Sequence, residues 1–361
     1  MKYMENVIYA VLIIAATMGY YPTVAAQTDE SVSLSELYQQ IDEAISQSPQ
    51  YEAEREHRIA ACVDSLLTAE GIEGRLVMAE KLFRLYEPYR NDSALYYAEL
   101  CISLADSLRR PDLSGRFRSL LAHQCSNADM LAEALEQLRL VKKSALDDIA
   151  LVDYYNAWMH VCGQLGSYTQ RSSVRQYYFD RQNLYRDSVL MVAKEGSDEW
   201  YHLKVDILSA RRLYQEALAL SDQWLQKLPD NTHESAFAAF YRSMVYSSLG
   251  NHDQTCYWLG KSALDDIKCA VRDQASLLFL SERLADDGDL SRARRYMEYV
   301  RECNLAFCPR LRTYQVSSVV NVLEKDSQAS VSRMTLLLVI AGVVIALLLV
   351  ALLYALFRRS K

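Results

Sequence analysis

The sequence is poor in the two residues that form most tight turns. Its 361 residues include only 11 glycines and 6 prolines. Strict alternation of apolar and polar residues is also nearly absent between Leu34 and Lys325. Because all-β domains need frequent turns and strands of period two, these absences argue against an all-β fold. Hydrophobic residues make up 51% of the chain, which provides for a sizeable core and argues against extensive disorder.

Motifs for nucleotide binding, covalent catalysis and metal binding are missing as well. The chain contains no GxGxxG, GxxxxGK[ST], GxSxG, CxxC or HExxH pattern and no carboxylate–histidine cluster. The pairs His123/Cys125 and His160/Cys162 are two residues apart, so on a helix their side chains point to different sides. We therefore expect a protein that is not an enzyme, with no cofactor and no metal site.

An excess of basic residues is lacking too. The formal net charge is −7, whereas a nucleic-acid-binding surface needs a basic face to displace counterions from phosphates. Two adjacent acidic pairs, Asp147-Asp148 and Asp265-Asp266, both occur within the sequence ALDDI. Because neighbouring side chains on a helix diverge by ~100°, we expect these carboxylates on solvated faces and not in a catalytic pair.

A helical period is present throughout the body of the chain. One apolar stripe comprises Leu213, Ala217, Leu220, Trp224 and Leu228, with polar residues between them. About fifteen helices are predicted, most of 12–20 residues, with a longer one around Tyr168–Lys194. Helix ends or turns are expected near Pro49, Pro88, Pro111, Gly163/Gly166, Pro229, Gly250 and Gly288.

Small residues recur early in helices that follow a turn, as close packing between repeated helix pairs requires. They occupy Ala94, Ala134, Ala217, Cys256 and Ala293, and Tyr185–Leu190 is interpreted as a further helix opening with Val189. Most of the intervals are 37–40 residues, with one of 55 and one of 28, and tetratricopeptide repeats have a standard period of ~34. The sequence thus predicts an all-α, tetratricopeptide-like solenoid whose concave surface binds a protein or peptide. A helical bundle without repeats is the alternative.

Eight cysteines and 25 tyrosines complete the unusual features of the composition. An even number of cysteines permits disulfides in an exported chain, and Cys303/Cys308 are the nearest pair. Most of the cysteines, however, lie on stripes where a small buried residue fits. The tyrosines are interpreted as packing residues, with an aromatic ligand platform as the alternative.

The first long apolar segment, Val7–Met18, is too short to cross a membrane comfortably. It is followed by Gly19–Pro22 and then by small residues. This layout predicts a secretory signal peptide over residues 1–26, cleaved between Ala26 and Gln27. An uncleaved anchor is the alternative.

The second apolar segment, Met334–Phe357, contains no charged residue. At ~1.5 Å per residue it is long enough to cross a ~30 Å hydrocarbon layer. We expect a transmembrane helix over 334–357 with stop-transfer residues after it: Arg358, Arg359 and Lys361. The expected protein is anchored in the inner membrane, with a periplasmic domain (27–325), a juxtamembrane linker (326–333) and a cytoplasmic basic tail (358–361).

Small residues within this segment are spaced for helix pairing. Gly342 and Ala346 are four apart, as are Ala351 and Ala355. Such spacing lets two membrane helices approach closely. A homodimer, or association with a longer relative, is therefore a further expectation, although small residues are common in any membrane helix.

Several stretches resemble one family of Bacteroidota proteins of unknown function that carry tetratricopeptide repeats. They include RNDSALYYAELCISLAD, YYFDRQNLYRDSVL and, most specifically, ALDDIKCAVRDQASLLFLSERLADDGDLSRA. The resemblance extends from about Leu34 through the apolar segment at 334–357. It implies a membrane-bound regulator with a periplasmic repeat domain and, in longer members, a cytoplasmic coiled coil and helix-turn-helix domain. Only RRSK follows Phe357 here, so direct DNA binding is not expected.

These expectations favour an envelope-facing binding module that senses or regulates by recognising a protein or peptide. Its output would pass through a partner. Two alternatives stay open from the sequence. One is a structural or assembly scaffold of the cell envelope, and the other is a truncated relic of a membrane-bound transcriptional regulator.

Overall fold

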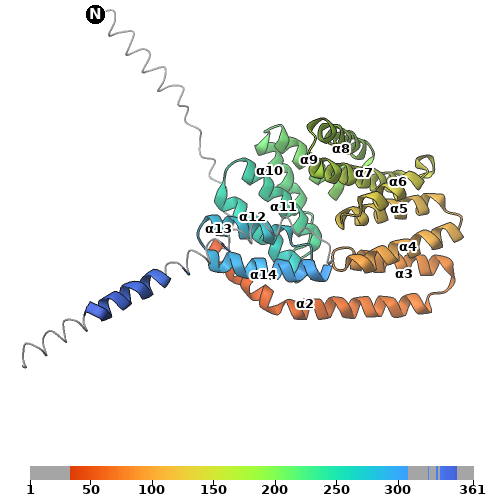
Figure 1. Ribbon diagram of the computed structural model, residues 1–361. Coiled ribbons are helices and arrows are strands. Elements are labelled where there is room, and N and C mark those ends of the chain that lie inside the picture. Colours follow the sequence, from red (N-terminus) through yellow and green to blue (C-terminus); the bar gives the residue numbers. More distant parts are fainter. Residues whose placement is uncertain (1–32, 308–323, 325–330, 332–333, 348–361) are drawn as a thin grey trace, which may run out of the picture.

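The computed structural model describes residues 33–307, 324, 331 and 334–347, and all regular secondary structure in these ranges is helical (Figure 1). Within 33–307 the helices are, in chain order, α2 (Leu34–Thr68), α3 (Gly71–Tyr86), α4 (Asn91–Ser107), α5 (Pro111–Asn127), α6 (Leu131–Leu140), the short 3-10 helix η1 (Lys143–Ala145), α7 (Asp148–Tyr168), α8 (Ser172–Val192), α9 (Asp198–Ala210), α10 (Tyr214–Leu225), α11 (His233–Ser248), α12 (His252–Lys268), α13 (Ala275–Asp286) and α14 (Leu290–Phe307).

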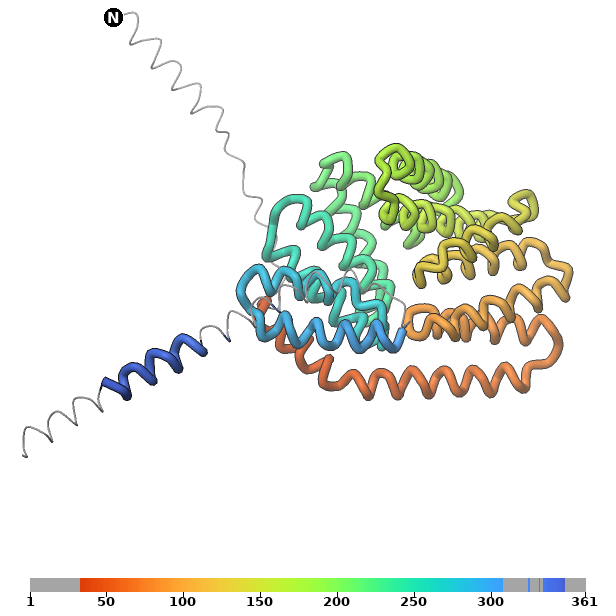
Figure 2. Tube along the Cα trace, viewed as in Figure 1, coloured from red at the N-terminus to blue at the C-terminus, as the bar shows by residue number. Residues whose placement is uncertain are grey.

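Consecutive helices pack as antiparallel pairs, and the pairs stack along a curved path (Figure 2). Helices also contact the equivalent helix of the next pair, as α5 does with α7 and α9 with α11. This is the arrangement of a solenoid in which each pair buries its apolar face against its neighbours. The all-α, tetratricopeptide-like fold predicted from the sequence is confirmed.

Side-chain hydrogen bonds repeat with the length of one helix pair. Tyr89 bonds Glu56, 33 residues away, and Gln124 bonds Asn91, also 33 away. His160 contacts Ser126 at a separation of 34 residues. These separations match the ~34-residue tetratricopeptide period. The bonds therefore link successive repeats at corresponding places between α2 and α7.

The first described helix, α2, contributes to both ends of the array. Leu37 and Ile41 in its first half are fully buried with residues of α12, α13 and α14. Ile59 in its second half is buried with residues of α3, α4 and α5. Figure 1 shows α2 running along the molecule beneath α14 on one side and α3 on the other. A single 35-residue helix thus joins the two main cores.

Buried arginines hold the last repeats against the first. The Arg55 guanidinium donates to the carbonyl of Leu85 at 2.7 Å and to that of Cys269 at 2.6 Å. Arg272 donates through its backbone N–H to Pro88 O at 2.8 Å, and its guanidinium lies 3.9 Å from the centre of the Tyr89 ring. The contacts of Arg55 with Cys269 and of Arg272 with Tyr89 join segments more than 180 residues apart in sequence. The curved array is therefore closed by α2 and the turn after α3.

Some predicted helix boundaries are wrong. Pro49 lies inside α2, which is the longest described helix, whereas the predicted long helix around Tyr168–Lys194 is the 21-residue α8. Gly163 and Gly166 lie in the last two turns of α7, near its end as expected. Tyr185–Leu190 lies near the end of α8, so it is not a helix opening. Proline and glycine mark turns in most sequences, but tertiary packing overrides this tendency here.

Other residues predicted to mark helix ends or turns do lie at such positions. Pro111 is the first residue of α5, and Gly250 and Gly288 adopt positive φ in turns before α12 and α14.

The seven described cysteines, Cys62, Cys101, Cys125, Cys162, Cys256, Cys269 and Cys303, are free thiols. Cys308 lies outside the described residues.

Residues 334–347 form a helix whose side chains are exposed. In the part of the chain that the structure describes, no helix combines the length and apolar character needed to cross a membrane. The predicted span ends at Phe357, and residues 348–357 lie outside the described ranges.

Candidate functional site

The five small residues singled out by the repeat pattern occupy one structural position. Each is the fourth or fifth residue of an even-numbered helix and is at most 1% exposed: Ala94 in α4, Ala134 in α6, Ala217 in α10, Cys256 in α12 and Ala293 in α14. A small side chain there lets the helix approach its neighbours closely. These buried positions support the packing of the array.

Helix α8 lacks this small residue and achieves close approach in another way. The glycines of α7 leave space for side chains of α8. A Cβ placed on Gly166 would lie 2.7 Å from a ring carbon of Phe179, and one on Gly163 would lie 2.7 Å from the Gln182 amide nitrogen. The small residues that permit close packing therefore lie on α7 in this repeat.

The other predicted sites belong to the chain ends. Met334, Gly342 and Ala346 lie on the described helix 334–347, and a Cβ on Gly342 would meet no atom within 4 Å. The remaining predicted residues lie outside the described ranges: Ala26, Gln27, Ala351, Ala355, Phe357, Arg358, Arg359 and Lys361.

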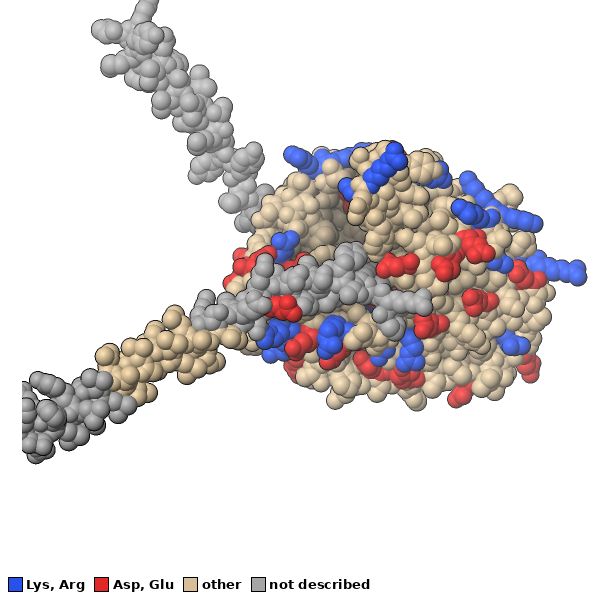
Figure 3. Space-filling model, viewed as in Figure 1, with Lys and Arg blue, Asp and Glu red and all other residues tan. Residues whose placement is uncertain are grey.

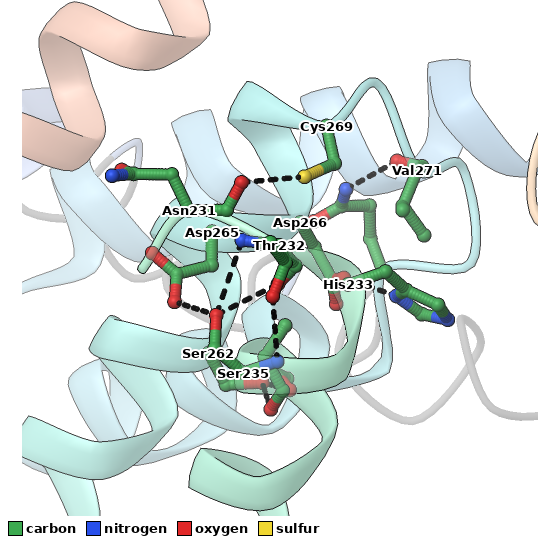
Figure 4. A network of polar contacts seen from close by, with 12 residues as sticks. Asn231, Thr232, His233, Ser235, Ser262, Asp265, Asp266, Cys269 and Val271 are labelled. Atoms are coloured by element: carbon green, nitrogen blue, oxygen red, sulfur yellow. Dashed lines mark hydrogen bonds and ion pairs between the residues drawn. The ribbon is translucent and has the colours of Figure 1, made fainter. Parts of the chain in front are cut away.

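A polar network joins the start of α11 to the end of α12 (Figure 4). Ser235 donates to Asp265 at 2.7 Å, and His233 Nδ1 lies 2.7 Å from an Asp266 oxygen. The two aspartates are 4% and 6% exposed. The expectation that Asp265-Asp266 lies on a solvated face is therefore wrong, because α11 covers both carboxylates.

The network also contains a carboxylate–histidine pair that sequence analysis did not indicate. His233 and Asp266 are 33 residues apart, so the pair forms only when consecutive repeats stack. Burial disfavours the charged imidazole, but the Asp266 carboxylate outweighs this effect and raises the pKa of His233 to about 8. The repeat length was the one signal in the sequence that could have indicated this pairing.

The geometry of the network does not resemble a nucleophile–base–acid chain. Figure 4 shows Ser235 directed at Asp265, while His233 points to Asp266 on the other side of α11. The nearby thiol of Cys269 donates to the carbonyl of Asn231 at 3.2 Å. Among the described residues, these hydrogen bonds hold α11 on α12 and give the histidine, the hydroxyl and the thiol separate acceptors.

Helix α8 is the least covered helix of the array. It packs closely on α7 and only slightly on α9, and Val189 is its single buried residue among 21. Its α7 side is fixed by aromatic contacts, with the Tyr185 ring stacked 5.4 Å from the Trp158 ring and Arg181 bonded to the Tyr185 hydroxyl. One face of the helix is therefore firmly held, and the other is left open.

The open face carries a line of large apolar side chains, which we call the α8 stripe. Its members are Val174, Tyr177, Leu184 and Met191, which are 37%, 54%, 60% and 80% exposed. Their spacings of three and seven residues place them along one side of the helix. Sequence analysis predicted the helix but not the stripe, because the pattern does not reveal which side of α8 meets α7.

The comparisons with known proteins agree with the fold. A family model described as the SusR N-terminal TPR (tetratricopeptide repeat) domain matches residues 45–318. No curated protein matches the chain. The matched region includes all helices from α3 to α14 and the second half of α2. Because this match spans more than half of the 361 residues, the chain belongs to the family of SusR N-terminal TPR domains.

Proposed function

We propose that this chain is a protein-interaction module of a regulatory system, and that the α8 stripe binds a helix of a partner protein. The observation that carries the proposal is the exposed line of Tyr177, Leu184 and Met191 on a helix otherwise fixed to the array. Seven-residue spacing matches the seam along which two helices pack. Exposed apolar residues in such a line are more typical of an interaction site than of an ordinary surface.

The charges around the stripe indicate the character of the partner helix. The segment from Arg171 to Val192 contains four arginines and two aspartates, in a chain whose formal net charge is −7. Figure 3 shows basic side chains along the upper edge of the molecule, where Figure 1 places α8 to α10. An amphipathic helix with acidic residues beside its apolar face would complement both features.

We further propose that the module lies in the periplasm, anchored to the inner membrane. The apolar segment 334–357 followed by Arg358, Arg359 and Lys361, and the signal-peptide pattern of residues 1–26, support this topology. Binding would then report on an envelope protein to a regulator, in keeping with membership of a SusR family. External protease added to spheroplasts should degrade the helical domain, and protection of the domain would contradict the topology.

The partner can be sought by photocrosslinking in living cells. A photoreactive amino acid replaces Leu184 in one variant and Leu67 in a matched control. Leu67 is also an exposed leucine on a helix, at 78% exposure, but it is not part of the stripe. We expect a crosslinked protein from position 184 that is absent from position 67, and peptide mapping should place the crosslink on a helix of that protein.

Three results would contradict the proposal. They are equal crosslinking from both positions, no crosslink from position 184, and a crosslink from position 184 to a second copy of this chain. Recovery of only envelope-assembly proteins would keep the interaction role but replace regulation with a scaffold function.

A further inference from the structure

Three potential metal ligands converge where α12 meets the turn between α13 and α14. Among the described residues, His252, Cys256 and Asp287 form the group of histidine, cysteine and acidic side chains whose ligand atoms all lie within 4.8 Å of one another. His252 Nε2 lies 2.7 Å from Asp287 Oδ2 and 3.5 Å from Cys256 Sγ. From this geometry we propose that the three side chains bind a zinc-class divalent cation.

The local backbone explains how the ligands meet. His252 and Cys256 are four residues apart on α12, so their side chains lie one above the other on the same face. Asp287 ends α13, and Gly288 after it adopts a φ of +86° that turns the chain into α14. Asp287 is 35 residues beyond His252, so the site joins two consecutive repeats.

Packing alone does not account for the cysteine. The equivalent positions of other repeats hold alanine, at Ala94, Ala134, Ala217 and Ala293, and all are fully buried. Alanine therefore satisfies the need for a small residue. Only in α12 is the small residue a thiol, and only there does its sulfur contact a histidine one turn earlier.

The distances suit a tetrahedral ion after a small adjustment. Zinc lies ~2.3 Å from cysteine sulfur and ~2.0 Å from histidine nitrogen, which places these two atoms about 3.5 Å apart around a tetrahedral ion. The Sγ to Nε2 distance already has this value, at 3.5 Å. The imidazole and the Asp287 carboxylate must separate by about 0.6 Å to admit the metal, since their direct hydrogen bond would be replaced by metal bonds.

Exposure and charge also favour an open metal site. The side chains of His252 and Asp287 are 43% and 46% exposed, whereas Cys256 is buried. The charged and titratable groups around the thiol are Asp287, Asp253, Arg283 and Tyr38, with two acidic groups against one arginine. Three protein ligands and a solvent-facing side leave a fourth position for water or for a ligand from another molecule.

The test uses the full-length chain in detergent, reduced and freed of metal with a chelator, and then titrated with Co²⁺. We expect one equivalent to bind, with the near-ultraviolet charge-transfer band of a cobalt–thiolate bond and the visible bands of a tetrahedral site. Zn²⁺ should displace the cobalt. C256S should lose the charge-transfer band, while H252A and D287N should weaken cobalt affinity at least 10-fold.

Matched variants separate this site from nonspecific binding. H233Q disrupts the other histidine–aspartate pair, and C62S removes a partly buried thiol that contacts the Met78 carbonyl. Both should bind cobalt as the wild type does. Circular dichroism without metal checks that each variant is folded, and D287N, at an exposed turn, provides the test if C256S is unstable. Absence of the thiolate band in the wild type, its persistence in C256S, or its loss in H233Q would overturn the proposal.

Discussion

At the scale of single residues, the structure depends on polar side chains that stacking places in contact. Asp265 and Asp266 look like a solvated acidic pair in the sequence, yet α11 covers both of them. Burying a carboxylate is costly unless it is paired or hydrogen-bonded. Ser235 supplies the hydrogen bond for Asp265, and His233 supplies the partner for Asp266. The stability of this junction should therefore depend on the protonation of one histidine.

The pH dependence follows from the raised pKa of His233. The folded-state pKa is about 8, above the ~6.5 of an unfolded chain. The charged pair with Asp266 therefore contributes fully below about pH 6.5 and is lost as the pH rises through about 8. Because the side chain is 47% exposed, solvent screening reduces the contribution to about 1 kcal/mol.

Urea unfolding of the wild type and H233Q measures this contribution. The stability difference between them should be about 1 kcal/mol larger near pH 6 than near pH 9.5. H57Q, which alters an exposed histidine of α2, should show no such change. A difference between wild type and H233Q that is the same at both pH values would show that folding does not raise the pKa of His233.

At the scale of helices, most elements follow from the sequence, and the exceptions have a common cause. The 3.6-residue pattern and the turns at Pro111, Gly250 and Gly288 give correct boundaries because local preference and packing agree there. Gly163 and Gly166 were expected near a helix end, and they lie in the last two turns of α7. Their packing role was not predicted: Gln182 and Phe179 of α8 occupy the space that a side chain would need. A single sequence does not reveal such a neighbour.

Alanine substitution distinguishes a glycine that close helix packing requires from one that it does not require. In G166A the new methyl group meets the Phe179 ring at 2.7 Å. Its overpacking cost of ~1–3 kcal/mol exceeds the ~1 kcal/mol gained in helix preference. In G74A of α3 the nearest atom is 3.8 Å away, so the variant should gain about 0.5–1 kcal/mol. Thermal unfolding should thus shift in opposite directions, and stabilisation by G166A would contradict the close approach of α7 and α8.

At the scale of the whole molecule, the array is held in a closed curve by its first helix. The sequence predicted the stacked repeats but not the closure, because the contacts of Arg55 with Cys269 and of Tyr296 with Tyr38 join positions more than 200 residues apart. Pro49, which usually ends a helix, lies inside α2 between the two cores. The sequence did not predict the α8 stripe either, because the exposure of a helix face depends on whether another helix packs against it.

Two leucines of α2 test the closure. Leu37 is fully buried against α12, and a Cβ on Gly260 would lie 2.8 Å from it. L37A should cost ~2–5 kcal/mol in unfolding free energy. L67A, on the same helix at 78% exposure, should change stability by less than about 0.5 kcal/mol. Similar small effects in both would mean that the first half of α2 does not pack on the last repeats.

The most direct test of the central claim is the affinity of the crosslinked partner, once purified, for the wild type and for α8-stripe variants. L184D and M191D place a charge in the proposed seam and should weaken binding at least 10-fold each, since central apolar residues carry ~2 kcal/mol or more. Both side chains are exposed, so thermal unfolding should be unchanged. L67D should bind as the wild type does. Unchanged affinity in L184D and M191D would contradict an interaction through α8.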